Sequence, residues 1–169
     1  MGELYERGVR FMSLGHLSNN ELGGTSTPWF GNRSLTAHGR EVLDAMSEVG
    51  MLLDVAHASP AMLPELLAHP RAVPFSSHAG LQGVTPMWRK HTDETCRAIA
   101  EKGGVLGVIF APQLLGGRSL DNLVLHIEHA VQVMGEDAVG FGSDFDGMVG
   151  LPRGMRDVRD LPKVTGALL

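Results

Sequence analysis

The sequence predicts an α/β protein with parallel strands, from three observations along its 169 residues. Short apolar segments alternate with segments whose apolar residues have helical spacing. This alternation repeats about every 30 residues, the length of one strand-helix unit. Glycines stand where the helical segments should end, at Gly50, Gly103 and Gly135. Alternation of this kind is typical of parallel sheets and of barrels.

Five buried strands are expected, each a short apolar segment followed by a loop. They cover residues 9–16, 51–57, 72–78, 104–111 and 138–144. The helical segments between them place apolar residues on one face. These residues are Val42, Leu43, Met46 and Val49, then Met62, Leu63, Leu66 and Leu67, and later Leu123, Ile127, Val131 and Met134. Ser59 followed by Pro60 has the pattern of a helix N-cap.

Two parallel folds fit this alternation. A (β/α)₈ TIM barrel needs about 250 residues, so residues 1–169 would form a single partial domain with five of the eight units. A doubly wound sheet of five strands fits the length and should bind a ligand at its switch point. Length alone does not choose between them.

The composition excludes several classes of protein. Lys and Arg number 14 against 19 Asp and Glu, a net charge of −5 without any block of like charges, so nucleic acid is not an expected partner. There is no apolar stretch of about 18 residues and no secretion signal. We therefore expect a cytoplasmic protein with no membrane span. Cys96 is the single cysteine and is expected to be a small buried side chain.

Polar side chains end four of the five apolar segments. They are His16, His57, His78 and Asp144. In a barrel of parallel strands the carboxyl ends converge on one face, so these side chains would line one cavity. Imidazole and carboxylate groups are the usual ligands of zinc. A single histidine at the end of a strand is commonly a hydrogen-bonded structural residue. Polar residues at the corresponding ends of four strands favour a metal site instead.

Other polar residues give weaker signals. Asp54 lies within a buried strand and needs a partner, either for structure or to support a ligand. Asp146 is expected to shape its loop, and Thr92 or Asp93 to cap a helix that follows His91. We expect two histidines, His126 and His129, on a solvated helix face. The loop over residues 17–34 is long enough to be a site loop or lid.

Six segments form an ordered set of motifs: YERGVRFMSLGH (5–16), LTAHGREVLDAMSEVGMLLDVAHAS (35–59), PFSSH (74–78), DETCRAIAEKGGVLGV (93–108), VGFGSDFDG (139–147) and residues 157–168. This set resembles the membrane dipeptidase (renal dipeptidase) family of zinc peptidases. The resemblance covers essentially the whole chain. It implies a (β/α)₈ barrel of the metal-dependent hydrolase type, two Zn²⁺ ions, dipeptide substrates and a homodimer.

The resemblance also implies roles for individual residues. His57 and His78 match the histidines that bind one zinc, and Asp144 matches an aspartate that lies near the other metal and transfers protons. His16 resembles the histidine that contacts the substrate and its tetrahedral anion. Arg89 resembles the arginine that contacts the substrate, where a guanidinium suits a carboxylate. A zinc-bound hydroxide would attack the peptide carbonyl.

This sequence departs from the family in one respect. Members have a His-x-Asp on the first strand and a glutamate that bridges the zincs, and both would precede residue 1, so we expect strands four to eight of the barrel and little turnover from this chain alone. Two alternatives follow. One is a non-catalytic fragment or interaction module, and the other is a different metal-dependent amidohydrolase.

Overall fold

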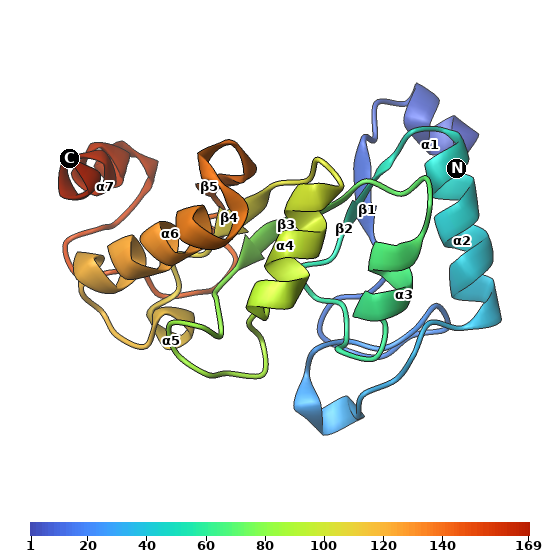
Figure 1. The fold of residues 1–169 in the computed structure, drawn as a ribbon, viewed down its shortest axis with the longest axis horizontal. Helices are drawn as coiled ribbons and strands as arrows, with labels where there is room; N and C mark the ends of the chain where they lie inside the picture. The colour runs from blue at the N-terminus through green and yellow to red at the C-terminus, as the bar shows by residue number, and fades with distance from the viewer. The chain divides into compact units, whose positions relative to one another are not determined.

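The strands of the sheet follow one another in chain order. The computed structural model describes residues 1–169, and its five strands are ordered β1-β2-β3-β4-β5 (Figure 1). A doubly wound sheet reverses its order at a switch point, and this sheet does not. The predicted fold class, parallel α/β of the barrel type with five strand-helix units, is confirmed.

Contacts divide the chain into two compact units. Unit 1 contains Met1–Ser76 and Ala98–Val105, and unit 2 contains Ser77–Arg97 and Leu106–Leu169. Strand β3 (Pro74–Ala79) and helix α4 (Asp93–Glu101) each contribute residues to both units.

Unit 1 contains parallel strands with a helix packed against them. Strand β1 (Phe11–Ser13) pairs with β2 (Leu52–Asp54), and β2 pairs with the first residues of β3. Helix α2 contacts β2 and buries Leu43 and Met46, as the helical spacing predicts. The helices of this unit are α1 (Gly2–Glu6), η1 (Pro28–Phe30), α2 (Ala37–Glu48) and α3 (Leu63–Ala68).

Unit 2 has a parallel pair of strands covered by its longest helix. Strand β4 (Leu106–Val108) pairs with β5 (Val139–Phe141), and helix α6 (Leu120–Met134) contacts both strands (Figure 1). Ser119 caps α6 by accepting a hydrogen bond from the Asp121 N–H at 3.1 Å. The remaining elements are α5 (Pro112–Leu115), η2 (Glu136–Ala138), η3 (Val158–Asp160) and α7 (Leu161–Leu168).

The core of unit 2 is apolar and includes the predicted buried cysteine. Its fully buried side chains include Cys96, Leu106, Val108, Phe110, Leu115 and Leu123, which come from α4, β4, the segment after β4, α5 and α6. The ring of Phe110 meets the edges of Phe141 and Phe145 at centroid distances of 5.7 and 5.9 Å. This cluster lies directly beneath the loop that follows β5.

The paired strands are shorter than the apolar segments predicted. Residues 9–16 contain β1 only at Phe11–Ser13, and residues 138–144 contain β5 only at Val139–Phe141. Apolarity reports burial rather than backbone pairing, and buried residues continue beyond the last hydrogen-bonded position. Three predicted site residues, His16, His57 and Asp144, therefore each lie three positions after a strand has ended.

The start of α3 also differs from its prediction. The helix begins at Leu63, with Met62 at its N-cap, instead of directly after Ser59. The Ser59 hydroxyl accepts a hydrogen bond from the Met62 N–H at 3.2 Å and so caps the turn that precedes the helix.

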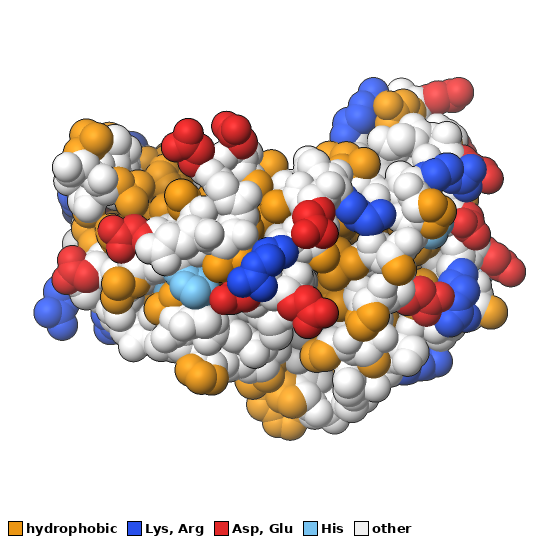
Figure 2. Space-filling view, viewed as in Figure 1, with side chains coloured by type: hydrophobic (Ala, Val, Ile, Leu, Met, Phe, Trp, Pro, Cys, Tyr) orange, Lys and Arg blue, Asp and Glu red, His pale blue; other side chains and the backbone are white.

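The surface agrees with the charge analysis. Figure 2 shows acidic and basic side chains interspersed over the visible face, with no concentration of Lys and Arg. None of the helices combines the length and the apolarity that are needed to cross a lipid bilayer.

The predicted solvent exposure of His126 and His129 is wrong. His126 is fully buried, and its Nδ1 accepts a hydrogen bond from the Leu81 N–H at 3.1 Å. His129 is half-buried, with its Nε2 2.8 Å from Oδ1 of Asp93. The two side chains lie on the face of α6 that is turned toward the core of unit 2 and toward the start of α4. Their spacing resembles that of a polar helix face, but the two side chains form hydrogen bonds from α6 to Leu81 and to Asp93.

Burial of His126 makes the stability of the protein depend on pH. Burial is the main cause that lowers the pKa of His126 to about 4, and the charge of Lys90 acts in the same direction. Unfolded histidine has a pKa of about 6.5, so between pH 6.5 and 4 the unfolded chain binds a proton that the folded chain does not. The free energy of unfolding should therefore fall as the pH is lowered through this window.

Replacement by glutamine tests this coupling. In His126→Gln the side-chain amide oxygen can still accept from the Leu81 N–H, but no group titrates. The loss of unfolding free energy between pH 7 and pH 5, measured by urea denaturation, should be smaller than in wild type by about 2 kcal/mol. The exposed His38 on α2 provides the matched control, His38→Gln. An unchanged pH dependence in His126→Gln would contradict the prediction.

Candidate functional site

His16 and His57 lie together in unit 1. Their ring centroids are 4.3 Å apart with an angle of 63° between the ring planes. His57 is buried and His16 is exposed, so the pair extends from the interior to the surface. The structure thus brings together two of the residues that the sequence analysis selected from different strand ends.

The loop over residues 17–34 holds the backbone of this histidine pair. The Thr25 hydroxyl donates a hydrogen bond to the His16 carbonyl, and the Ser26 N–H donates to the His57 carbonyl at 2.9 Å. Thr25 also forms an antiparallel bridge with Ala58. The loop predicted as a site loop or lid thus fixes both candidate histidines at their main chains.

His78 lies within strand β3 and belongs to unit 2. Its Nδ1 is 2.7 Å from the hydroxyl oxygen of Ser77. A hydrogen bond at one ring nitrogen fixes the orientation of the imidazole and leaves Nε2 as the nitrogen suited to a metal. Ser77 was not identified by the sequence analysis, although its position beside a candidate ligand was the available signal.

Arg89 is buried, which sequence reasoning did not predict for a loop arginine. Its guanidinium donates a long hydrogen bond of 3.4 Å to the His78 carbonyl. The loop around it is fixed by the Lys90 ammonium, which donates to the Thr85 carbonyl at 2.7 Å. A guanidinium that is already buried and held can pair with a carboxylate at little cost in side-chain entropy.

His91 is a second buried histidine next to these residues. The backbone N–H of His91 donates to the Gly80 carbonyl at 3.0 Å. Burial, and then the charges of the nearby Arg89 and His78, lower the pKa of the His91 imidazole to about 3. His91 is therefore a neutral side chain within the wall of the site. Thr92 accepts a hydrogen bond from the Thr95 N–H at 3.2 Å, which confirms the predicted cap of the following helix.

Asp144 lies in a backbone conformation that is rare outside glycine. Its φ is 58°, and Asp146 and Met148 follow with φ values of 63° and 60°. Such left-handed residues are commonly found at functional sites, where the surrounding structure holds them. Asp146 is exposed and helps to shape this loop, in agreement with its predicted role.

Two glycines let strands β4 and β5 approach the end of β3 in unit 2. A Cβ atom on Gly107 would lie 2.4 Å from the Ser77 carbonyl oxygen, and one on Gly142 would lie 2.3 Å from the same oxygen. Only glycine fits at either position without a shift of the backbone. Ser77 directly precedes His78, and Gly142 lies two residues before Asp144. The close approach of Gly142 to Ser77 therefore places His78 and Asp144 on neighbouring segments of backbone.

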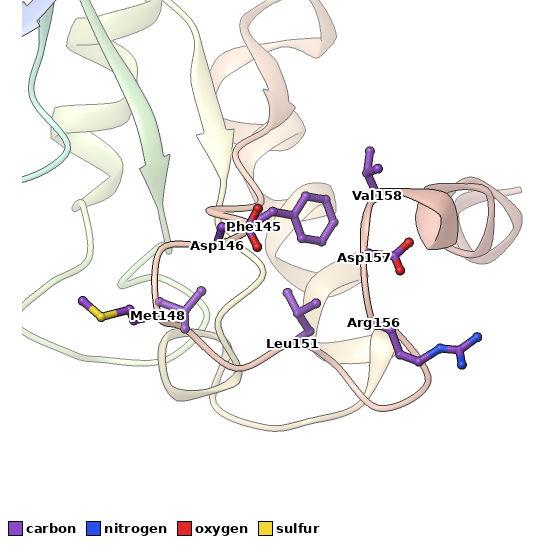
Figure 3. Close-up of a pocket in the computed structure, with 8 residues that line it drawn as sticks. Phe145, Asp146, Met148, Leu151, Arg156, Asp157 and Val158 are labelled. Atoms are coloured by element: carbon purple, nitrogen blue, oxygen red, sulfur yellow. The ribbon is translucent and has the colours of Figure 1, made fainter.

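A surface cavity of about 320 Å³ lies beside the Asp144 loop. Figure 3 shows Phe145 and Leu151 on one side of it and Asp157 and Val158 on the other, while Arg156 points away. The loop after β5 thus carries Asp144 and also forms a wall of this cavity.

The candidate metal ligands are divided between the two units. His57 belongs to unit 1, whereas His78 and Asp144 belong to unit 2, and within neither unit do three His, Cys, Asp or Glu side chains come together as a metal site. The donor types, two imidazoles and a carboxylate, nevertheless fit zinc, and the Ser77 contact to His78 is of the kind that orients a ligating imidazole. Asp54, the buried strand aspartate, accepts a hydrogen bond from the Ala56 N–H at 3.0 Å.

Comparison with known families gives one clear match. The family model described as membrane dipeptidase (peptidase family M19) matches residues 1–169. Among curated proteins, the chain is 32% identical over 174 residues to dipeptidase verJ of Clonostachys rogersoniana, covering 100% of this chain and 44% of the relative. The chain thus spans less than half the length of this relative.

Solved structures agree with the family match. Dipeptidase AC, described as a metallopeptidase of family M19, superimposes with a TM-score of 0.90 at 28% identity, over 99% of this chain and 51% of that protein. A second structure is a metallopeptidase from Rhodobacter sphaeroides bound to a phosphinate mimic of the dipeptide L-Ala-D-Ala. It superimposes with a TM-score of 0.84 at 26% identity, over 99% of this chain and 51% of that protein.

Proposed function

Because the chain belongs to the membrane dipeptidase family, we propose that it acts in the zinc-dependent hydrolysis of small dipeptides with free termini. The observation that supports this most directly is the buried Arg89 guanidinium held at the carbonyl of His78. A substrate with a free carboxylate would pair with the charge of this guanidinium. A buried arginine is unusual in a loop.

The chain supplies residues for binding and for proton transfer. His57, His78 and Asp144 are the proposed zinc ligands, and bound zinc would supply a nucleophilic water by lowering its pKa. Arg89 would bind and orient the substrate carboxylate. His16 would donate a hydrogen bond to the carbonyl oxygen of the scissile bond, where negative charge develops.

Asp144 is the proposed general base and general acid. Its carboxylate would accept a proton from the attacking water and return it to the nitrogen of the leaving amino acid. The new carbon–oxygen bond would form first, and the carbon–nitrogen bond would then break as its nitrogen is protonated, so that the products are two free amino acids.

We further infer a homodimer, which light scattering on the purified protein would test.

Release of free amino acids tests this function. Purified protein supplied with zinc should cleave L-Ala-L-Ala or L-Ala-D-Ala at the low rate expected of this chain alone, lose activity with a chelator and recover it with zinc. N-acetylated and C-amidated forms of the same dipeptides should not be cleaved. Equal cleavage of blocked and free dipeptides would instead indicate another amidohydrolase. A folded protein that binds no zinc and cleaves none of these would indicate a non-catalytic module.

A further inference from the structure

We propose that Gly147 is a positioning residue for Asp144, holding its carboxylate in the orientation that proton transfer requires. This inference rests on the proposed function of Asp144. It assigns a role to the glycine that ends the Ser-Asp-Phe-Asp-Gly segment, residues 143–147.

The carboxylate of Asp144 lies directly against the α-carbon of Gly147. A Cβ atom at residue 147 would be 2.2 Å from Oδ1 of Asp144, 2.6 Å from its Cγ and 2.9 Å from its Oδ2. All three atoms of the carboxylate would be closer to this Cβ than the shortest distance at which non-bonded atoms approach a Cβ. The space occupied by the carboxylate therefore exists only because residue 147 has no side chain.

The backbone leaves Asp144 little freedom to adjust by other means. The Gly147 N–H donates to the Asp144 carbonyl at 3.1 Å, which closes the turn between the two residues. Asp144, Asp146 and Met148 all have left-handed φ values. This loop also forms one wall of the cavity in Figure 3. With the main chain fixed, a side chain at 147 must displace the carboxylate by rotation about χ1 or χ2 of Asp144.

Alanine at this position separates the collision from backbone strain. The φ of Gly147 lies outside the left-handed region, so alanine can adopt its backbone conformation. In Gly147→Ala the added methyl group should move the Asp144 carboxylate by an ångström or more. Misplacement on this scale can lower the rate of a chemical step by about 100-fold.

We expect Gly147→Ala to lower kcat for dipeptide hydrolysis by about 10- to 100-fold, with KM nearly unchanged. The matched control is Gly150→Ala in the same loop. A Cβ on Gly150 would contact only Nε2 of Gln113 and Cδ of Pro112, both at 3.8 Å, and its φ is likewise outside the left-handed region. Gly150→Ala should keep the wild-type kcat.

A double-mutant cycle tests whether Gly147 acts through Asp144. In an Asp144→Ala background there is no carboxylate to displace, so adding Gly147→Ala should not lower kcat further. If Gly147→Ala lowers kcat by the same factor in both backgrounds, Gly147 acts elsewhere and the proposal is overturned.

Crystal structures of wild type and Gly147→Ala provide a readout that does not depend on activity. The Asp144 carboxylate should occupy a different rotamer in the alanine variant, while Gly150→Ala retains the wild-type rotamer. An unmoved carboxylate overturns the positioning role even if the enzyme is active. If wild type cleaves no dipeptide but the carboxylate moves as expected, the proposed function fails and the positioning role of Gly147 stands.

Discussion

Asp144→Asn is expected to lower kcat for dipeptide hydrolysis by about 10²- to 10⁴-fold, the range attributed to general acid–base groups. Asparagine has nearly the same size and shape as aspartate, and like aspartate it tolerates the left-handed backbone, with φ of 58°, found at this position. The fold should therefore persist while the proton acceptor is lost. The measurement is initial rate at saturating dipeptide and zinc, with unfolding by urea as the check on folding.

An exposed aspartate just before the same strand gives the control. Asp137 lies in η2, directly ahead of β5, and its side chain faces solvent. Asp137→Asn should retain the wild-type kcat. Should Asp144→Asn keep more than about a tenth of wild-type kcat, a group other than Asp144 must transfer the proton.

The fold was largely predictable because it follows from periodicity. The helical spacing of Leu43 and Met46, or of Leu123 and Ile127, reports which side of a helix is buried, and these side chains are buried in the structure. The stops at Gly50, Gly103 and Gly135 were also predictable, since each of these glycines has a positive φ that ends a helix. The order of the strands, the lengths over which they pair and the start of α3 required the structure.

The candidate site was predictable in composition but not in its supports. His16, His57 and Asp144 stand out because polar residues follow apolar strands, a rule that needs no three-dimensional information. The burial of Arg89 depends on how the loop after β3 folds back, which no local pattern encodes. The contact between the neighbours Ser77 and His78 depends on the conformations of their side chains.

His126 shows where a local pattern gives the wrong answer. It follows Leu123 by three residues and precedes Ile127, so it shares the buried face of α6, but polarity suggested the opposite side. Tertiary contacts outweigh the preference of this residue. The left-handed φ of Asp144 was not predicted, because aspartate tolerates this conformation but adopts it less often than glycine does.

Phe110→Ala is expected to lower the free energy of unfolding by about 3–5 kcal/mol, the usual loss for a buried aromatic residue. Phe110 is 0% exposed and follows β4 at the centre of the unit 2 core. Its removal also deprives Phe141 and Phe145 of an edge-to-face partner. Phe145 is next to Asp144, so the variant should bind zinc less tightly as well as unfold more easily. Urea denaturation monitored by circular dichroism measures the first effect, and zinc titration the second.

Phe30→Ala separates core packing from the mere loss of a phenyl ring. Phe30 is 52% exposed in η1, so its replacement should change the free energy of unfolding by less than about 0.5 kcal/mol. If both variants lose the same small amount of stability, the segment around Phe110 must relax to fill the space, and the loop after β5 would not depend on the aromatic cluster beneath it. A large loss in Phe110→Ala alone, together with weaker zinc binding, would mean that packing beneath the β5 loop supports the position of Asp144.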